Sequence, residues 1–144
     1  MLRDKIYIAS DHGGYKLKNE LCAYFKNNAI SYEDLGAYND KSCDYADYAH
    51  LLASKIDSNS FGILICGSGI GISIGANRHK NIRCALCNES LSAKLARKHN
   101  DANVLALGGR LLGTDLAIDI VTNFINTDFD GGRHKKRIEK IEVC

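Results

Sequence analysis

Residues 62–74 read GILICGSGIGISI, and this stretch decides the fold. It begins with a short continuous apolar run, which is typical of a strand buried on both faces of a parallel sheet. Gly67, Gly69 and Gly71 then occupy alternate positions before an isoleucine-rich segment suited to a helix. A strand, a glycine turn and a helix start together place backbone N–H groups around an anion. The stretch therefore predicts an anion-binding turn with the thiol of Cys66 at its edge.

Similar apolar runs lie on both sides of this stretch. The pattern predicts strands at residues 5–10, 30–35, 62–66, 82–87 and 104–107. It predicts helices through residues 17–25, 45–56, 70–74, 91–99, 116–124 and 133–141, with Asp44, Asn88 and Thr114 as N-caps. Strands that alternate with helices indicate a parallel sheet covered on both faces. We therefore expect an α/β fold, a three-layer αβα Rossmann-like sandwich with a five-stranded parallel sheet.

Size and composition narrow the class of protein. At 144 residues the chain is one domain, residues 1–144, and its net charge of +2 does not call for nucleic acid as a partner. No apolar run approaches the roughly 20 residues of a membrane span, and the N-terminus lacks the apolar segment of a signal peptide. We expect a cytoplasmic protein that does not bind a membrane.

The six cysteines are expected to be free thiols, because several lie in apolar runs where cysteine is usually a small buried side chain. Cys84 and Cys87 form a C-x-x-C pattern, but within a strand rather than at a helix start. Residues three apart in a strand point to opposite faces, so we expect neither a redox nor a zinc role.

Polar residues gather where the predicted strands end. Asp11 and His12 follow the first strand, residues 66–71 end the third, and Arg110 follows the fifth. Ligands bind at the carboxyl ends of the strands in such sheets, so these residues are candidates for a site. Asp11 and His12 also fit the simpler role of capping the first helix.

The glycine turn matches no nucleotide motif. A dinucleotide fingerprint needs G-x-G-x-x-G, but Ile72 and Ile74 stand where its last glycine belongs. No Lys-Ser or Lys-Thr follows the glycines, as a phosphate loop requires. Glu89 lies twenty residues past Gly69, where a ribose-binding acid would be, so nucleotide binding stays open. A tight turn without a ligand stays open too.

Cys66 ends its strand where the helix amides begin, a position that favours the thiolate form. A thiolate can act as a base or as a nucleophile, while a buried structural cysteine is the alternative.

Two further groups of residues lie near the ends of predicted helices. His99, which ends a helix, is more commonly a terminal residue than a catalyst. Arg133 and Arg137 lie one helical turn apart, and two guanidinium forks on one face suit a phosphate. The basic run that contains them is otherwise a solvated helix face, and it lacks the interleaved aromatic residues of a nucleic-acid patch.

Taken together, these residues resemble the ribose-5-phosphate isomerase B family, which also includes the galactose-6-phosphate and allose-6-phosphate isomerases. The resemblance covers essentially the whole chain. It rests on SDHGG at 10–14, DY at 44–45, ICGSGIG at 65–71, the segment 93–103, and GGRH at 131–134 with Arg137.

The resemblance implies an aldose–ketose isomerase without metal or cofactor. Cys66 would be the base that moves a proton between the two carbons flanking a cis-enediolate. The developing negative oxygen would be stabilised by the Ser68 hydroxyl and by the backbone amides of Gly67, Ser68, Gly69, Ile70 and Gly71. His99 would open the sugar ring, and Asp11 would handle hydroxyl protons.

The remaining implied roles concern substrate binding and assembly. Asn100 would orient the substrate, and the phosphate would be held by His12, Arg110, Arg133 and Arg137. The family is dimeric with sites built from both subunits, so a homodimer with shared active sites is expected. Some members use a glutamate just after the glycine turn; here that position is Ile72, so the role of base falls to Cys66.

The leading hypothesis is therefore interconversion of D-ribose 5-phosphate and D-ribulose 5-phosphate, a step of the pentose phosphate pathway. Isomerisation of another phosphorylated aldose, allose 6-phosphate or galactose 6-phosphate, is a close alternative. A non-catalytic module that binds a nucleotide or a phosphate through the same glycine turn is the alternative from another class.

Overall fold

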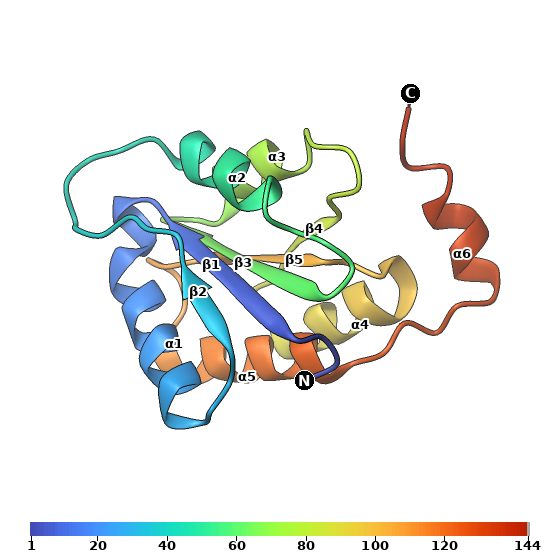
Figure 1. The fold of residues 1–144 in the computed structure, drawn as a ribbon, viewed down its shortest axis with the longest axis horizontal. Coiled ribbons are helices and arrows are strands. Elements are labelled where there is room, and N and C mark those ends of the chain that lie inside the picture. The colour runs from blue at the N-terminus through green and yellow to red at the C-terminus, as the bar shows by residue number, and fades with distance from the viewer. Residues whose placement is uncertain (144) are drawn as a thin grey trace.

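The computed structural model describes residues 1–143 and forms a five-stranded, wholly parallel sheet with helices on both faces (Figure 1). The elements follow in the order β1 (Lys5–Ser10), η1 (His12–Gly14), α1 (Tyr15–Asn27), β2 (Tyr32–Asp34), α2 (Tyr45–Ala53), β3 (Ser60–Cys66), α3 (Ile70–Ala76), β4 (Cys84–Leu86), α4 (Ser90–Asn100), β5 (Val104–Gly108), α5 (Thr114–Asn126) and α6 (Arg133–Ile138). The strands lie in the order β2-β1-β3-β5-β4. The predicted α/β class and the five parallel strands are confirmed.

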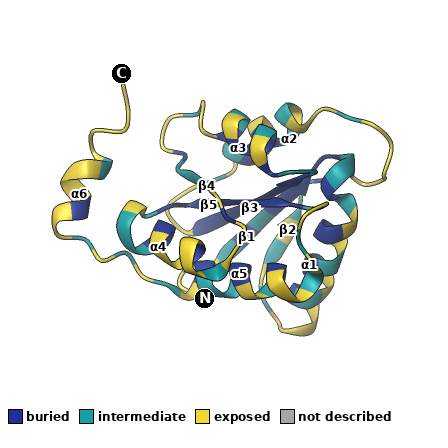
Figure 2. Ribbon diagram, turned by 180° about the vertical axis from the view of Figure 1, so that it is seen from behind, coloured by how far each residue is buried: buried dark blue, intermediate teal, exposed yellow. Residues whose placement is uncertain are grey.

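Two apolar cores separate the three layers. On one face of the sheet, α1, α4 and α5 cover a core that includes Phe25, Phe61 and Phe124. On the other face, α2 and α3 cover a second core that includes Leu52, Leu64 and Ile72. All residues of β3 and β5 are buried, which explains why residues 62–66 read as a continuous apolar run (Figure 2). The three-layer arrangement is confirmed.

The edge strands are shorter than the sequence predicts. β2 spans Tyr32–Asp34 rather than 30–35, and β4 spans Cys84–Leu86 rather than 82–87. Each of these strands has a neighbour on one side only, so fewer ladder hydrogen bonds hold its ends. Two helices are also shorter than predicted: α2 ends at Ala53 before Ile56, and α6 ends at Ile138 before Ile141.

Two of the three predicted N-caps are wrong. Glu89, not Asn88, caps α4, because its carboxylate accepts from the Leu91 and Ser92 amides at 2.6 and 2.7 Å. Gly113 occupies the N-cap position of α5, and the Thr114 hydroxyl instead bonds to Glu20. Asp44 does occupy the N-cap position of α2, although its side chain makes no capping bond.

The cysteines of the described residues are free, as predicted, while Cys144 lies outside those residues. Cys84 packs against the core under α2 and α3, whereas Cys87 belongs to the opposite core. The two thiols of the C-x-x-C pattern therefore face opposite sides of the sheet, as the strand geometry requires. Burial raises the pKa of Cys87 to about 11, which fits an inert structural thiol.

Within residues 1–143, no helix combines the length and the apolar character that crossing a membrane requires.

Candidate active site

Strand order reverses between β1 and β3, and the polar residues that follow these two strands meet at that point. The turn after β1 lies directly on the turn after β3, since a Cβ on Gly13 would come within 2.9 Å of the Gly67 amide nitrogen. A Cβ on Gly109, after β5, would come within 2.7 Å of the Gly13 carbonyl oxygen. Three chain segments thus pack backbone to backbone, as only glycine permits.

Cys66 is the last residue of β3 and is only 4% exposed. Its Sγ accepts a hydrogen bond from the Gly69 N–H at 3.1 Å. Gly69 reaches this position with φ at +79°, and a Cβ there would lie 2.6 Å from Leu86 Cδ1. A non-glycine residue in this backbone conformation costs roughly 1–2 kcal/mol before any steric clash. The glycine turn therefore closes around the thiol, at the start of α3.

The turn also carries amide groups free for a ligand. Ile70 N–H donates to Ser68 Oγ at 3.2 Å, but within residues 1–143 the N–H groups of Gly67, Ser68 and Gly71 donate to no protein acceptor. Free donors at a helix start form a site for negative charge. The thiol and the free amides lie in one turn, so a possible base lies beside donors that can stabilise an oxyanion.

Arg110 and His12 add donors to the same edge of the sheet. The Arg110 guanidinium lies over Gly67, with Nη1 3.1 Å from the position of a Gly67 Cβ. His12 Nδ1 accepts from the Cys43 N–H at 3.2 Å, which leaves Nε2 as the donor of the neutral ring. A hollow of about 540 Å³ opens beside His12, between α1 and Asp40. These two side chains can therefore bind an anion close to the glycine turn.

Asp11 and Tyr45 complete this part of the site. Asp11 is 5% exposed, and its Oδ1 accepts from the Gly14 N–H at 3.2 Å, so the predicted capping role is real. Tyr45, the first residue of α2, places its ring 2.6 Å from the position of a Gly71 Cβ and is 45% exposed. The sequence placed Tyr45 in a predicted helix and in the DY motif of the family resemblance but gave it no role in the site; its close approach to Gly71 shows that its ring lines the site.

The other predicted site residues form a second cluster on α4 and α6. The His99 and His134 rings stack with centroids 4.5 Å apart and planes inclined by 14°. Burial, and then the neighbouring His99 and Arg133, lower the pKa of His134, which favours the neutral ring. A shallow hollow of about 370 Å³ on α6 is lined by Arg133, Lys136, Arg137 and Lys140. This cluster is basic and suited to a phosphate.

One group of possible metal ligands lies here. In the part of the chain that the structure describes, donor atoms of His99, Asp130 and His134 lie within 4.8 Å of one another. A metal ion lies in the plane of each imidazole that binds it, and nearly parallel stacked rings share no such point. The observed geometry therefore fits stacking, and metal binding would require one ring to rotate.

The two clusters lie at opposite ends of the sheet. α4 begins after β4 and returns to the start of β5, so His99 and Asn100 lie near Asn103, whereas Gly109 lies beside Cys66. From Asn103 to Gly109 the chain rises about 20 Å. In Figure 1 the end of α4 and α6 occupy one end of the molecule, and the turn from β1 into α1 occupies the other. One chain therefore does not bring His99 to its own Cys66.

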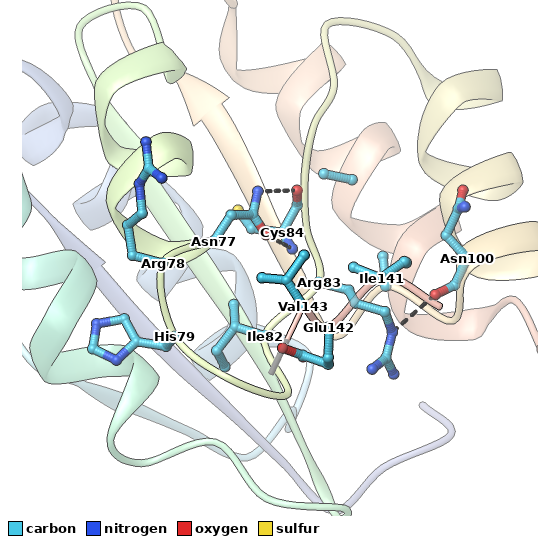
Figure 3. A pocket seen from close by; sticks show the side chains of 12 residues that line it. Asn77, Arg78, His79, Ile82, Arg83, Cys84, Asn100, Ile141, Glu142 and Val143 are labelled. Atoms are coloured by element: carbon cyan, nitrogen blue, oxygen red, sulfur yellow. Dashed lines mark hydrogen bonds between the residues drawn. The ribbon is translucent and has the colours of Figure 1, made fainter. Parts of the chain in front are cut away.

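A separate cavity of about 510 Å³ lies beside Asn100, between the C-terminal tail and residues 77–85 (Figure 3). Its polar lining is largely engaged within the protein: Asn77 bonds to the backbone of Cys84, and Arg83 bonds to the Asn100 carbonyl oxygen. Cys66 does not line this cavity. The candidate site is defined by its chemistry rather than by this hollow.

Comparison with known proteins identifies the family of the chain. The family model described as ribose/galactose isomerase matches residues 6–141. Ribose-5-phosphate isomerase B of Escherichia coli is 42% identical over 139 residues, covering 95% of this chain and 93% of that protein. Relatives from Bacillus subtilis and Rickettsia conorii, 49% and 45% identical over 95% of this chain and 94% and 96% of their own length, are named only as sugar phosphate isomerases, without a stated sugar.

Two solved structures extend the likeness to three dimensions. A ribose 5-phosphate isomerase from Thermotoga maritima superposes with a TM-score of 0.95 at 49% identity, covering 97% of this chain and 98% of that one. Ribose-5-phosphate isomerase B from Mycoplasma genitalium, solved with bound ribulose-5-phosphate, gives a TM-score of 0.90 at 42% identity, covering 95% and 93%. Fold and relatives together define a sugar phosphate isomerase. The chain belongs to the ribose/galactose isomerase family, together with the type B ribose-5-phosphate isomerases.

Proposed function

We propose that this protein interconverts D-ribose 5-phosphate and D-ribulose 5-phosphate through a cis-enediolate, with Cys66 as the base. The observation that carries the proposal is the turn in which the Cys66 thiol adjoins the free amides of Gly67, Ser68 and Gly71. Bound ribulose-5-phosphate in the Mycoplasma genitalium relative supports a pentose phosphate as the substrate.

The chemistry follows from that turn. The Cys66 thiolate removes the proton from C2 of the open-chain aldose, the C–H electrons form a C1–C2 double bond, and the carbonyl oxygen O1 becomes negative. The free amides and the Ser68 hydroxyl donate to this oxygen, where preorganised donors contribute most. The hydroxyl on C2 then gives up its proton, which is transferred to O1, and C1 receives the proton held by the Cys66 thiol, which yields the ketose. In this proposal Asp11, which is buried and bonded to the Gly14 amide, exchanges the hydroxyl protons.

Two copies of the chain complete the site in this proposal. Leu91, Leu95 and His99 lie along one side of α4, and the two leucines are 61% and 37% exposed. Ile70, Ile74, Leu86 and Leu111, which follow or end strands at the carboxyl edge of the sheet, are exposed apolar side chains as well. A two-fold axis that crosses α4 pairs the two helices antiparallel, and 11 residues of helix span about 16 Å. This pairing brings the partner's His99 to the Leu91 end of α4, which lies at the same end of the sheet as Cys66 and Arg110. The partner's Arg133 and Arg137, which are next to its His99, come to that end as well.

A comparison of substrates tests the proposed specificity. We expect kcat/KM for ribose 5-phosphate, measured in EDTA, to exceed that for allose 6-phosphate or galactose 6-phosphate by about tenfold or more, the discrimination available to a pocket that fits one carbon fewer. Faster turnover of a hexose phosphate would assign the enzyme to that sugar instead. If no aldose phosphate is turned over and a nucleotide raises the Tm, the chain is a binding module and the proposal fails.

A further inference from the structure

Asp101 follows the predicted site residues His99 and Asn100 and forms the C-cap of α4 in the left-handed conformation, with φ 44° and ψ 43°. Its backbone N–H donates to the carbonyl oxygens of Ala96 and Arg97. Aspartate is one of the few non-glycine residues that tolerate this conformation. The helix therefore stops abruptly, with His99 and Asn100 as its last residues.

The carboxylate of Asp101 faces three arginines from three separate segments. Arg97 Nη1 donates to Oδ1 at 2.8 Å, while Arg83 Nη2 lies 3.4 Å from Oδ2 and Arg3 Nη2 lies 3.6 Å from Oδ1. Asp101 and its partners are partly to almost wholly buried, with side-chain exposures from 4% for Arg97 to 28% for Asp101. The Asp101 carboxylate offsets the mutual repulsion of three cations that the fold holds close together.

The arginines are themselves fixed. The Arg97 guanidinium lies 5.0 Å from the Phe61 ring centroid and donates to the Ala102 and Thr127 carbonyl oxygens. Arg3 lies 4.6 Å from the same ring. Arg83 Nε donates to the Asn100 carbonyl oxygen at 3.0 Å, the bond drawn between Arg83 and Asn100 in Figure 3. A continuous network of hydrogen bonds and arginine–ring contacts thus reaches from the core to the backbone of Asn100.

We propose that Asp101 is a positioning residue for the reaction: through Arg83 and Arg97 it fixes the turn that presents His99 and Asn100 to the substrate of the partner site. This inference rests on the proposed function. A displacement of about 1 Å at catalytic groups costs about 100-fold in rate, so loosening a turn that three ion pairs hold should be measurable in kcat.

Two variants separate the carboxylate from the backbone conformation. Asp101→Gly keeps the left-handed turn and removes the carboxylate, whereas Asp101→Asn keeps the turn and one acceptor oxygen. We expect Asp101→Gly to lower kcat for ribose 5-phosphate by about 10- to 100-fold and Asp101→Asn to restore most of it. The matched control is Glu33→Gln, which removes an exposed ion pair with Lys5 and should leave kcat unchanged.

A double-variant cycle with His99→Asn gives a result that a purely structural role would not give. If Asp101 acts through His99, the double variant loses less kcat than the product of the two single losses. An unchanged kcat in Asp101→Gly, or losses that multiply both in this cycle and in the same cycle with Asn100→Ala, would overturn the inference. A wild-type protein without isomerase activity would instead overturn the proposed function, so the two failures are distinguishable.

Discussion

Cys66→Ala is expected to lower kcat for ribose 5-phosphate by about 10³-fold or more, the range that a general base contributes. The reason is local. Cys66 Sγ lies within the turn formed by Gly67 to Gly71, and the side chain of Ile72, just after that turn, is a buried hydrocarbon that cannot act as a base. No second group in that turn can take the proton from carbon. Stability should change little, because a small side chain is replaced by a smaller one at a strand end. Activity assays beside thermal unfolding separate the two effects.

Two further variants sharpen this expectation. Cys66→Ser keeps the size and should be almost as inactive, since a hydroxyl ionises far less readily than a thiol. Cys22→Ala is the matched control: burial raises the pKa of Cys22 to about 11, so this thiol on α1 is protonated at neutral pH and its loss should leave kcat unchanged. An alanine at 66 that retains wild-type kcat would show that the base lies elsewhere.

His99→Asn is expected to lower kcat for ribose 5-phosphate by about 10²-fold or more, and to lower kcat for ribulose 5-phosphate far less. Ribose 5-phosphate is mainly a closed ring that must open before C2 can be deprotonated. Ribulose 5-phosphate cannot close a five-membered ring, because its O5 carries the phosphate. The two kcat values at saturating substrate therefore report ring opening separately from proton transfer.

The control for this substitution is His79→Asn, since His79 bonds to His50 on α2 and belongs to neither cluster. It should leave both kcat values unchanged. Equal losses for the two sugars in His99→Asn would contradict a ring-opening role and favour a role in binding alone.

Local signals in the sequence were enough to predict the central strands of the sheet and the glycine turn. β3 and β5 are buried on both faces, so hydrophobicity alone marks them, and the glycines at 67, 69 and 71 mark the turn that follows. The ends of the elements were less predictable, because they depend on neighbours in space. Glu89 replaces Asn88 as the cap of α4 through a side chain that reaches two amides, and β2 and β4 shorten because they lie at the edges of the sheet.

The site was predictable in its parts but not in its arrangement. Asp11, Cys66 and Arg110 follow strands of one parallel sheet, so the rule of carboxyl ends brings them together. No local pattern predicts that His99, Arg133 and Arg137 lie at the other end of the sheet, because their position depends on the direction of α4 and on the packing of α6 against it. The sequence did not predict that Tyr45 lines the site, since its close approach to Gly71 joins segments that are remote in sequence.

The central claim, a site that joins Cys66 of one chain to His99 of another, is tested most directly by mixing two impaired variants. Cys66→Ala and His99→Asn are unfolded together, refolded at equal concentration, and assayed with ribose 5-phosphate in EDTA, with each variant refolded alone as the control. Half of the resulting dimers carry one variant of each kind, and one of their two sites is intact, so we expect about a quarter of the wild-type rate. If the mixture forms mixed dimers but is no more active than the average of the two variants alone, Cys66 and His99 do not act together across two subunits, and the proposed site is wrong.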